Sequence, residues 1–259
     1  MKLLLIDAMN LIRRIYAAQE KRSDDPVDQT CLHSQNAILK NIEEAEATHV
    51  ALVFDGHQPT WRHKFYGEYK ADRKPMPNKL ADALPQYIEG FEALGIPCVL
   101  YDDLEADDVI ATLAVKVAQH GGQVRIISTD KGFMQIASER ISLYHYFDRR
   151  VLTYDDVEQQ LGLIPRQLPD YLSLVGDSTN HVPGVPGIGP KTAGELLDKY
   201  GDLDNILINS TDIPGKVGEQ LRENYRLALF ARKMVTLKVD CELGLNLQSL
   251  RYRPVGLVH

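Results

Sequence analysis

Acidic residues recur in this sequence where predicted strands end. Asp7 follows the apolar run at residues 2–6, and Asp55 follows a second apolar run at residues 48–54. An Asp at either point is also explained by turn formation, because its side chain hydrogen-bonds to nearby backbone. The alternative is a functional site, since sites in open α/β sheets form at the carboxyl ends of the strands.

A denser group of acids lies at residues 102–108, where five of the seven residues are Asp or Glu. Acids at a helix N-terminus are stabilised by the helix dipole, which is one explanation of the group. Five acids exceed what capping needs, however. Glu105 and Asp108 are three residues apart, so we expect them to share one helix face. Such a face, opposite the strand-end carboxylates, suits a hard divalent cation.

The acids therefore predict a metal site built from separated segments. Carboxylates share a site in such numbers only when cations neutralise them, and an all-oxygen ligand set favours Mg²⁺ or Mn²⁺, with at least one ion per chain. Such an ion lowers the pKa of bound water and stabilises charge on phosphorus, so the chemistry that we predict is phosphodiester hydrolysis. The candidate ligands are Asp107, Asp7, Asp55, Glu105, Asp108, Asp130 and Asp177.

Residues 58–77 mix cations with aromatic rings and contain few acids. Cations bind phosphates and rings stack on bases, so this composition suits single-stranded nucleic acid. An amphipathic surface segment is the alternative explanation. The segment includes Trp61, Arg62, Lys64, Tyr69, Lys70 and Arg73.

A glycine- and proline-rich loop lies at residues 182–191, where six of ten residues are Gly or Pro. Apolar residues at helical spacing flank it on both sides, and Pro190 suits the first turn of the second helix. Backbone N–H groups at a helix start attract phosphate. The stretch predicts a helical hairpin that holds a nucleic-acid backbone without reading bases, although a plain helix–loop–helix turn has the same pattern.

The order of the predicted elements indicates how these residues are positioned. Strands near residues 2–6, 48–54, 96–101, 124–128 and 141–147 alternate with helices, which predicts an α/β fold with a mostly parallel, doubly wound sheet. Residues 154–161, 168–175, 190–200 and 217–237 are predicted helices. We therefore divide the chain into an α/β core at 1–153 and a helical domain at 154–259.

The composition limits the class of protein. The chain has 259 residues, 44% hydrophobic and 25% charged, as in ordinary globular proteins. Its three cysteines fit no zinc spacing, and no apolar run reaches membrane-spanning length. We expect a cytoplasmic monomer with no membrane association. The net charge of −7 argues against bulk nucleic-acid binding but permits a local basic groove.

Taken in order, these motifs resemble the flap endonuclease or 5′-nuclease superfamily over nearly the whole chain. Within it they are most similar to the short stand-alone bacterial flap endonucleases of the exonuclease IX type. The resemblance is carried by residues 5–7 with Asn10, by 54–56, 69–73, 105–108 and 128–131, and by 176–191.

The resemblance implies a structure-selective 5′ flap endonuclease that depends on divalent metal and acts on flapped or branched DNA in replication or repair. It implies a PIN-like core carrying an arch at about residues 56–77, and a helix-three-turn-helix at about 168–200. The first metal site of the family corresponds to Asp7, Asp55, Glu105, Asp107 and Asp108. Its second site corresponds to Asp130 and Asp177, but two further acids are replaced by Gly132 and Asn180. A DNA junction-binding protein with weak or no catalysis is therefore the alternative.

The resemblance also assigns roles outside the metal site. Lys70 stabilises the scissile phosphate and Arg73 assists, while Tyr69 stacks on a base. Lys64 and Arg62 contact the DNA backbone. A K⁺ ion is held by the backbone carbonyls of Leu174, Val175, Pro183, Val185 and Ile188. The expected duplex contacts are Gly187, Ile188, Gly189, Pro190, Lys191 and Thr192.

Overall fold

A six-stranded sheet forms the centre of the computed structural model, which describes residues 1–22 and 25–254. The strand order is β3-β2-β1-β4-β5-β6, and every neighbouring pair is parallel except β5 and β6. This confirms the predicted α/β class. The three-residue β6 was not predicted, because so short a strand has no periodicity. The strands are β1 (Lys2–Asp7), β2 (His49–Phe54), β3 (Cys98–Leu100), β4 (Gln123–Ile127), β5 (Ile141–His145) and β6 (Arg150–Leu152).

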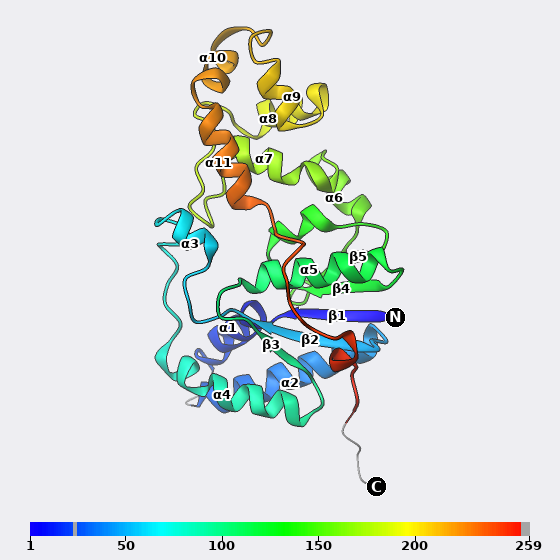
Figure 1. Cartoon of the computed structure of the whole chain (residues 1–259). Helices are drawn as coiled ribbons and strands as arrows, with labels where there is room; N and C mark the ends of the chain where they lie inside the picture. The colour runs from blue at the N-terminus through cyan, green and yellow to red at the C-terminus, as the bar shows by residue number, and fades with distance from the viewer. Residues whose placement is uncertain (23–24, 255–259) are drawn as a thin grey trace.

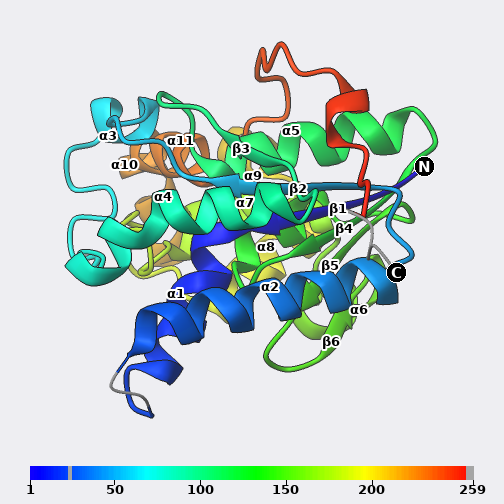
Figure 2. The ribbon, with the colours of Figure 1, turned by 90° about the horizontal axis from the view of Figure 1, so that it is seen from below.

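Helices cover both faces of the sheet, as Figures 1 and 2 show. Successive residues of β1 alternate between two cores: Leu3 and Leu5 pack against α5, and Leu4 and Ile6 pack against α1, α2 and α4. Burial on both sides explains why the strand is apolar without interruption. The helices are α1 (Ala8–Gln19), α2 (Pro26–Glu44), α4 (Asn78–Ala93) and α5 (Ala106–Gln119).

A second group of helices lies beyond the sheet, at the top of Figure 1, with its own apolar core. The helix predicted at 217–237 is two helices, because Asn224 ends α10 and begins α11. The short helix α9 was not predicted, although Asp202 caps it. The group comprises α7 (Leu168–Val175), α8 (Pro190–Tyr200), α9 (Leu203–Ile208), α10 (Gly215–Glu223) and α11 (Tyr225–Val235). The preceding helix, α6 (Tyr154–Leu161), buries Val157 in the core of the sheet instead.

After α11 the chain returns to the sheet and runs alongside α5, the red segment of Figure 1. Cys241, Leu243 and Leu250 are buried in the same core as α5, and Arg251 forms a β-bridge with His49. The last described part of the range assigned to the helical domain, 154–259, therefore packs on the α/β core. Residues 255–259 of that range lie outside the described residues. Among the described residues, no helix combines the length and apolar character needed to cross a membrane.

Candidate functional site

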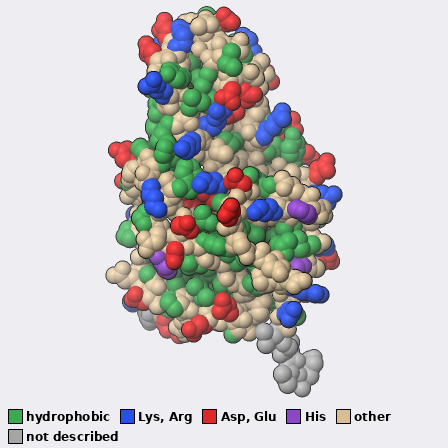
Figure 3. Space-filling view, viewed as in Figure 1, with side chains coloured by type: hydrophobic (Ala, Val, Ile, Leu, Met, Phe, Trp, Pro, Cys, Tyr) green, Lys and Arg blue, Asp and Glu red, His purple; other side chains and the backbone are tan. Residues whose placement is uncertain are grey.

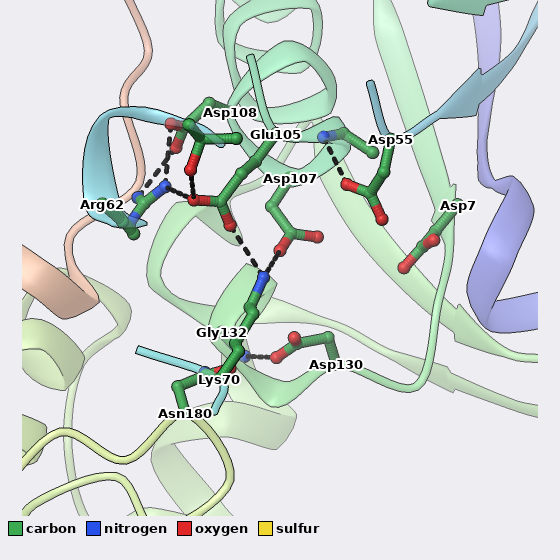
Figure 4. A network of polar contacts seen from close by, with 12 residues as sticks. Asp7, Asp55, Arg62, Lys70, Glu105, Asp107, Asp108, Asp130, Gly132 and Asn180 are labelled. Carbon is green, nitrogen blue, oxygen red and sulfur yellow. Dashed lines mark hydrogen bonds and ion pairs between the residues drawn. The ribbon is translucent and has the colours of Figure 1, made fainter. Parts of the chain in front are cut away.

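Four aspartates from separate segments line one pocket of about 320 Å³ at the carboxyl edge of the sheet. Asp7 ends β1, Asp55 follows β2, Asp130 follows β4, and Asp107 lies in the first turn of α5. The parallel register brings them together, because β1 pairs with both β2 and β4. In Figure 4 the side chains of Asp7, Asp55 and Asp107 lie around a common space, with Asp130 on its other side.

Three of these aspartates also accept hydrogen bonds from backbone N–H groups at the starts of helices. Asp7 accepts a hydrogen bond from the Asn10 backbone N–H at 3.1 Å, and Asp55 accepts one from the Ala106 N–H at 3.0 Å. Asp130 accepts from the Gly132 N–H at 2.7 Å, at the start of the 3₁₀ helix Lys131–Ile136. Turn formation and site formation are therefore not alternatives here: capping orients each carboxylate toward the pocket.

The pocket is electrostatically unfavourable without a cation. Burial, followed by repulsion from Asp55, raises the pKa of Asp7 to about 7. Burial also raises the pKa of Asp107, and the charges of Asp130, Asp7 and Asp55 add to this, while Lys70 opposes it. A cation at this position would relieve the repulsion, and four carboxylates are a donor set that suits Mg²⁺ or Mn²⁺.

The carboxylates surround the pocket and do not meet at a single point. Within the described part of the chain, no group of three or more His, Cys, Asp or Glu side chains is gathered closely enough to hold a metal ion. Repulsion between unneutralised carboxylates favours such spacing.

Asp108 does not line this pocket, contrary to its expected role as a metal ligand. Its side chain is fully buried and accepts two hydrogen bonds from Arg62, at 2.8 and 2.9 Å. It also accepts from Trp61 Nε1 and from the Lys238 backbone N–H, both at 2.9 Å. Glu105 accepts from Arg62 at 3.1 Å as well. The two acids thus share a helix face as expected, but that face meets a buried arginine and not the other carboxylates.

Arg62 connects three parts of the molecule. It lies in α3 (Trp61–Phe65) and is 2% exposed. Besides both acids of α5, it donates to the backbone carbonyls of Met234 and Thr236, each at 2.8 Å. A side chain held in this way cannot contact a DNA backbone, which corrects the reading of Arg62 as a cation of the arch. Its buried role has no signal in the sequence, because its partners are distant along the chain.

Lys70 reaches the acids from the arch. Its Nζ lies 2.7 Å from Glu105 Oε2 and 3.7 Å from Asp107 Oδ2, so it stands at the edge of the pocket (Figure 4). Burial opposes ionisation of Glu105, but the Lys70 and Arg62 charges prevail and lower the pKa of Glu105 to about 2. Glu105 is therefore an anion that the protein itself neutralises.

Tyr69 is buried, which corrects its expected role as a stacking platform for a DNA base. Only 5% of the residue is exposed, and its hydroxyl donates to Glu105 at 3.0 Å. Its ring faces the protein interior. Lys64 by contrast is exposed and Arg73 lines the pocket, so both remain accessible to a ligand.

Basic residues that we did not single out also line the pocket. Arg13 and Arg14 extend from α1, and Lys74 lies in the last part of the arch. Arg13 donates to the Lys74 backbone carbonyl at 2.9 Å, which ties α1 to this end of the arch. Arg13 and Arg14 both lie about two helical turns after Asp7, which could have indicated them. On the face in Figure 3, acidic and basic side chains are interspersed.

Asp177 does not reach the pocket either. Its carboxylate accepts from the Thr179 backbone N–H at 3.0 Å and from Asn180 Nδ2 at 2.7 Å. The pocket lining does not include it. In this structure both oxygens of Asp177 are instead hydrogen-bonded within its own loop, and its expected role as a metal ligand stays a prediction.

The glycine-rich loop packs tightly on the end of α7. The Val185 N–H donates to the Leu174 carbonyl at 2.8 Å, and the Ile188 N–H donates to the Val185 carbonyl at 3.1 Å. Val185 and Ile188 are buried. The remaining expected duplex contacts lie at the start of α8, which has no side-chain cap, so its first N–H groups are free to bind an anion. Of these, Thr192 is half-buried, and the exposed residues are Gly187, Gly189, Pro190 and Lys191.

Gly184 allows this close packing, which leads to a first prediction. A Cβ at this position would lie 2.4 Å from both the Gly176 nitrogen and the Val175 carbonyl carbon. We expect Gly184→Ala to lower the free energy of unfolding by about 1–3 kcal/mol, measured by urea denaturation, because backbone must move. The control is Gly194→Ala in α8, where a Cβ meets nothing within 4 Å; it should be neutral or stabilising. Equal stability of the two variants would contradict the packing described.

Comparison with known proteins adds to this geometry. Residues 2–162 match the family model described as "5′-3′ exonuclease, N-terminal resolvase-like domain", and residues 163–256 match "5′-3′ exonuclease, C-terminal SAM fold". The chain is 44% identical over 253 residues to "Flap endonuclease Xni" of Psychromonas ingrahamii, covering 96% of this chain and 97% of the relative. It is 43% identical to the protein of the same name from Aeromonas hydrophila, covering 97% and 96%.

Solved structures share the fold. The chain superposes on the T5 5′-exonuclease with bound zinc at a TM-score of 0.77 and 21% identity, covering 91% of this chain and 89% of that one. The catalytic core of Rad2 in complex with DNA substrate is more distant, at a TM-score of 0.57 and 16% identity, covering 93% and 81%. At these identities the likeness establishes the fold alone.

Proposed function

Because this chain belongs to the 5′-3′ exonuclease family, and within it to the bacterial flap endonucleases, we propose that it is a divalent-metal-dependent, structure-selective 5′ flap endonuclease. It hydrolyses phosphodiester bonds in flapped or branched DNA. The observation that carries the proposal is the pocket lined by Asp7, Asp55, Asp107 and Asp130, four carboxylates beside basic side chains.

These four aspartates are the residues that would hold the ion. Bound Mg²⁺ or Mn²⁺ supplies an activated water and stabilises the charge that develops on phosphorus. Glu105 and Asp108 support the site from outside it, since both are neutralised by Arg62 and fix the first turn of α5 that carries Asp107. The T5 relatives were solved with divalent metal ions and, in one case, with DNA, which agrees with this assignment.

The cations around the pocket orient the DNA backbone. Lys70 Nζ stands between Glu105 and the pocket residue Asp107, and Arg73 lines the pocket itself. Fixed positive charges stabilise the developing charge of a phosphoryl transition state. Lys70 and Arg73 are therefore the catalytic cations, and Arg13, Arg14 and Lys74 provide further phosphate contacts.

The helical hairpin would hold the duplex. At the start of α8, Gly187, Gly189, Lys191 and Thr192 present backbone N–H groups, while Pro190 begins the first helical turn without one. Lys191 adds an ammonium, and its side chain is 90% exposed. We further propose K⁺ at the end of α7, where helix carbonyls carry the negative end of the dipole. The carbonyls are those of Leu174, Val175, Pro183, Val185 and Ile188. With duplex DNA at the hairpin and single-stranded DNA at the arch, the point where the DNA changes from double to single strand would lie at the pocket.

A second candidate is a junction-binding protein with little catalysis. Gly132 and Asn180 occupy positions where the resemblance implies acids, and Asp177 is bound within its own loop. A second metal site is therefore poorly provided for in this chain, whereas the first pocket keeps four carboxylates.

One experiment separates the two candidates. Purified protein is incubated with a 5′-labelled flap, with nicked duplex and with single strand, over a titration of Mg²⁺. We expect cleavage that requires the metal, stops in chelator, and is at least about tenfold faster on the flap, since substrates are distinguished by transition-state binding. A protein that shifts the flap in a gel but leaves it uncut in both Mg²⁺ and Mn²⁺ is the junction binder.

A further inference from the structure

The loop at residues 177–182 of the helical domain is joined to the arch at residues 69–73. The Lys70 backbone N–H donates to the Asn180 carbonyl at 3.3 Å, and Arg73 Nη2 donates to Asn180 Oδ1 at 3.3 Å. His181 Nε2 lies 2.7 Å from Asp72 Oδ2. Three neighbouring residues of the arch are thus held by two neighbouring residues of the loop. We call this contact the arch junction.

Apolar packing reinforces the arch junction. Tyr69 and Val182 are buried in one small cluster with Ala231 and Met234 of α11. Lys70 and His181 face the junction in left-handed backbone conformations, with φ of 57° and 58°. Residues with side chains adopt this conformation only when their surroundings impose it. The backbone that carries the Lys70 ammonium is therefore set by contact with the helical domain.

Asn180 has a role in this junction that an acid could not fill. Its Nδ2 donates to Asp177 Oδ2 at 2.7 Å, while its Oδ1 accepts from Arg73. One amide therefore links a carboxylate on one side to a guanidinium on the other. An aspartate at this position could still accept from Arg73, but it has no hydrogen to donate and would repel Asp177.

We propose that Asn180 is a positioning residue for the cations of the pocket. By joining Asp177 to Arg73 and holding the Lys70 backbone, it couples the loop that leads into the DNA-binding hairpin to the two catalytic cations. The role deepens the proposed function and rests on it. It also gives the amide a purpose at a position where the resemblance implies an acid.

The experiment compares Asn180→Ala, Asn180→Asp and the exchange variant Asp177→Asn/Asn180→Asp, with Ser178→Ala as the control. Ser178 is exposed in the same loop and makes none of the contacts above. Single-turnover cleavage of a 5′ flap is measured at saturating enzyme, and flap affinity is measured separately. We expect the two single variants at Asn180 to be roughly 10-fold to 100-fold slower, with affinity changed by less than about threefold, because the cations are displaced and not removed.

The exchange variant is the decisive arm. It restores a donor and an acceptor between positions 177 and 180 with their identities swapped and the net charge unchanged. We expect its rate to return to within about threefold of wild type. An exchange variant as slow as Asn180→Asp, or an Asn180→Ala variant as fast as Ser178→Ala, would overturn the proposal.

A readout without catalysis separates this inference from the proposed function. Hydrogen exchange of the Lys70 and Arg73 amides should be about tenfold faster in Asn180→Ala than in wild type, while exchange in β1 and β4 stays unchanged. Unaltered exchange in the arch would refute the junction even if the enzyme is active. Faster exchange in a protein that cuts no flap would support the junction and reject the endonuclease.

Discussion

Asp107→Asn is expected to reduce Mg²⁺-dependent flap cleavage by roughly 10³-fold, which is about 4 kcal/mol of transition-state stabilisation. Asp107 lies in the first turn of α5 and lines the pocket with Asp7, Asp55 and Asp130. The substitution keeps the shape of the side chain but removes a negative charge, so a divalent ion loses a principal ligand. Single-turnover cleavage over a Mg²⁺ titration measures the effect.

The same substitution is expected to stabilise the metal-free protein. Burial and the neighbouring aspartates raise the pKa of Asp107, so the folded state is disfavoured when this carboxylate is charged at neutral pH. Removing the charge should raise the metal-free Tm by about 2–4 °C, the change expected for ~1 kcal/mol in a chain of this size. Added Mg²⁺ should raise the Tm of wild type much more than that of the variant, because only wild type has the full ligand set.

The pKa of Asp7 determines how the stability of the metal-free protein depends on pH. This pKa is raised from 3.8 to about 7, so the folded state holds a proton that the unfolded state has lost between these values. Metal-free stability should therefore fall as pH rises from about 4 to about 7, and Mg²⁺ binding in that window should release protons.

The control for Asp107→Asn is Asp103→Asn, an exposed acid just before α5. It removes the same charge from the same segment and should leave both cleavage and Tm unchanged. Wild-type cleavage by a folded Asp107→Asn protein would reject the assignment of the pocket as the metal site.

Arg62→Met is expected to destabilise the fold by about 3–5 kcal/mol, because it leaves Asp108 and Glu105 buried without their common partner. Arg62 is 2% exposed, donates twice to Asp108, and joins α5 to the Met234 and Thr236 carbonyls. The loss of these hydrogen bonds should separate the arch and the chain after α11 from the α/β core. Urea denaturation followed by circular dichroism measures it.

Acidic pH should reduce the loss of stability that Arg62→Met causes. The pKa of Glu105 is lowered to about 2 in the folded protein, so its contribution to stability is complete above about pH 4.5 and is lost as pH falls toward 2. The difference in free energy of unfolding between wild type and the variant should therefore become smaller below about pH 4.5.

Two further variants test the origin of this effect. Arg226→Met removes an exposed arginine from α11 and should cost less than about 0.5 kcal/mol. Adding Asp108→Asn to Arg62→Met should recover part of the loss, because it removes the uncompensated charge. If Arg62→Met lowers the free energy of unfolding equally at all pH values, and Asp108→Asn recovers none of the loss, then lost packing and not charge explains the destabilisation.

The sequence by itself determined the α/β architecture and the edge of the sheet where the aspartates of the pocket gather. Continuous apolar strands can only be buried on both faces, and parallel strands bring their carboxyl ends to one edge, so Asp7, Asp55 and Asp130 had to approach each other. Helical periodicity also placed Glu105 and Asp108 on one face of α5. These conclusions follow from local geometry that a short segment carries with it.

Only the tertiary structure decided which residues the candidate side chains contact. Glu105 and Asp108 face Arg62, and Asp177 is hydrogen-bonded within its own loop, so none of these three acids lines the pocket. Arg13 and Arg14 enter it instead. Tyr69 packs inward on Val182. The physical reason is that spacing along a chain sets the direction of a side chain relative to its own backbone. Its partner is set by how distant segments pack, here the arch, the chain after α11 and the loop before the hairpin.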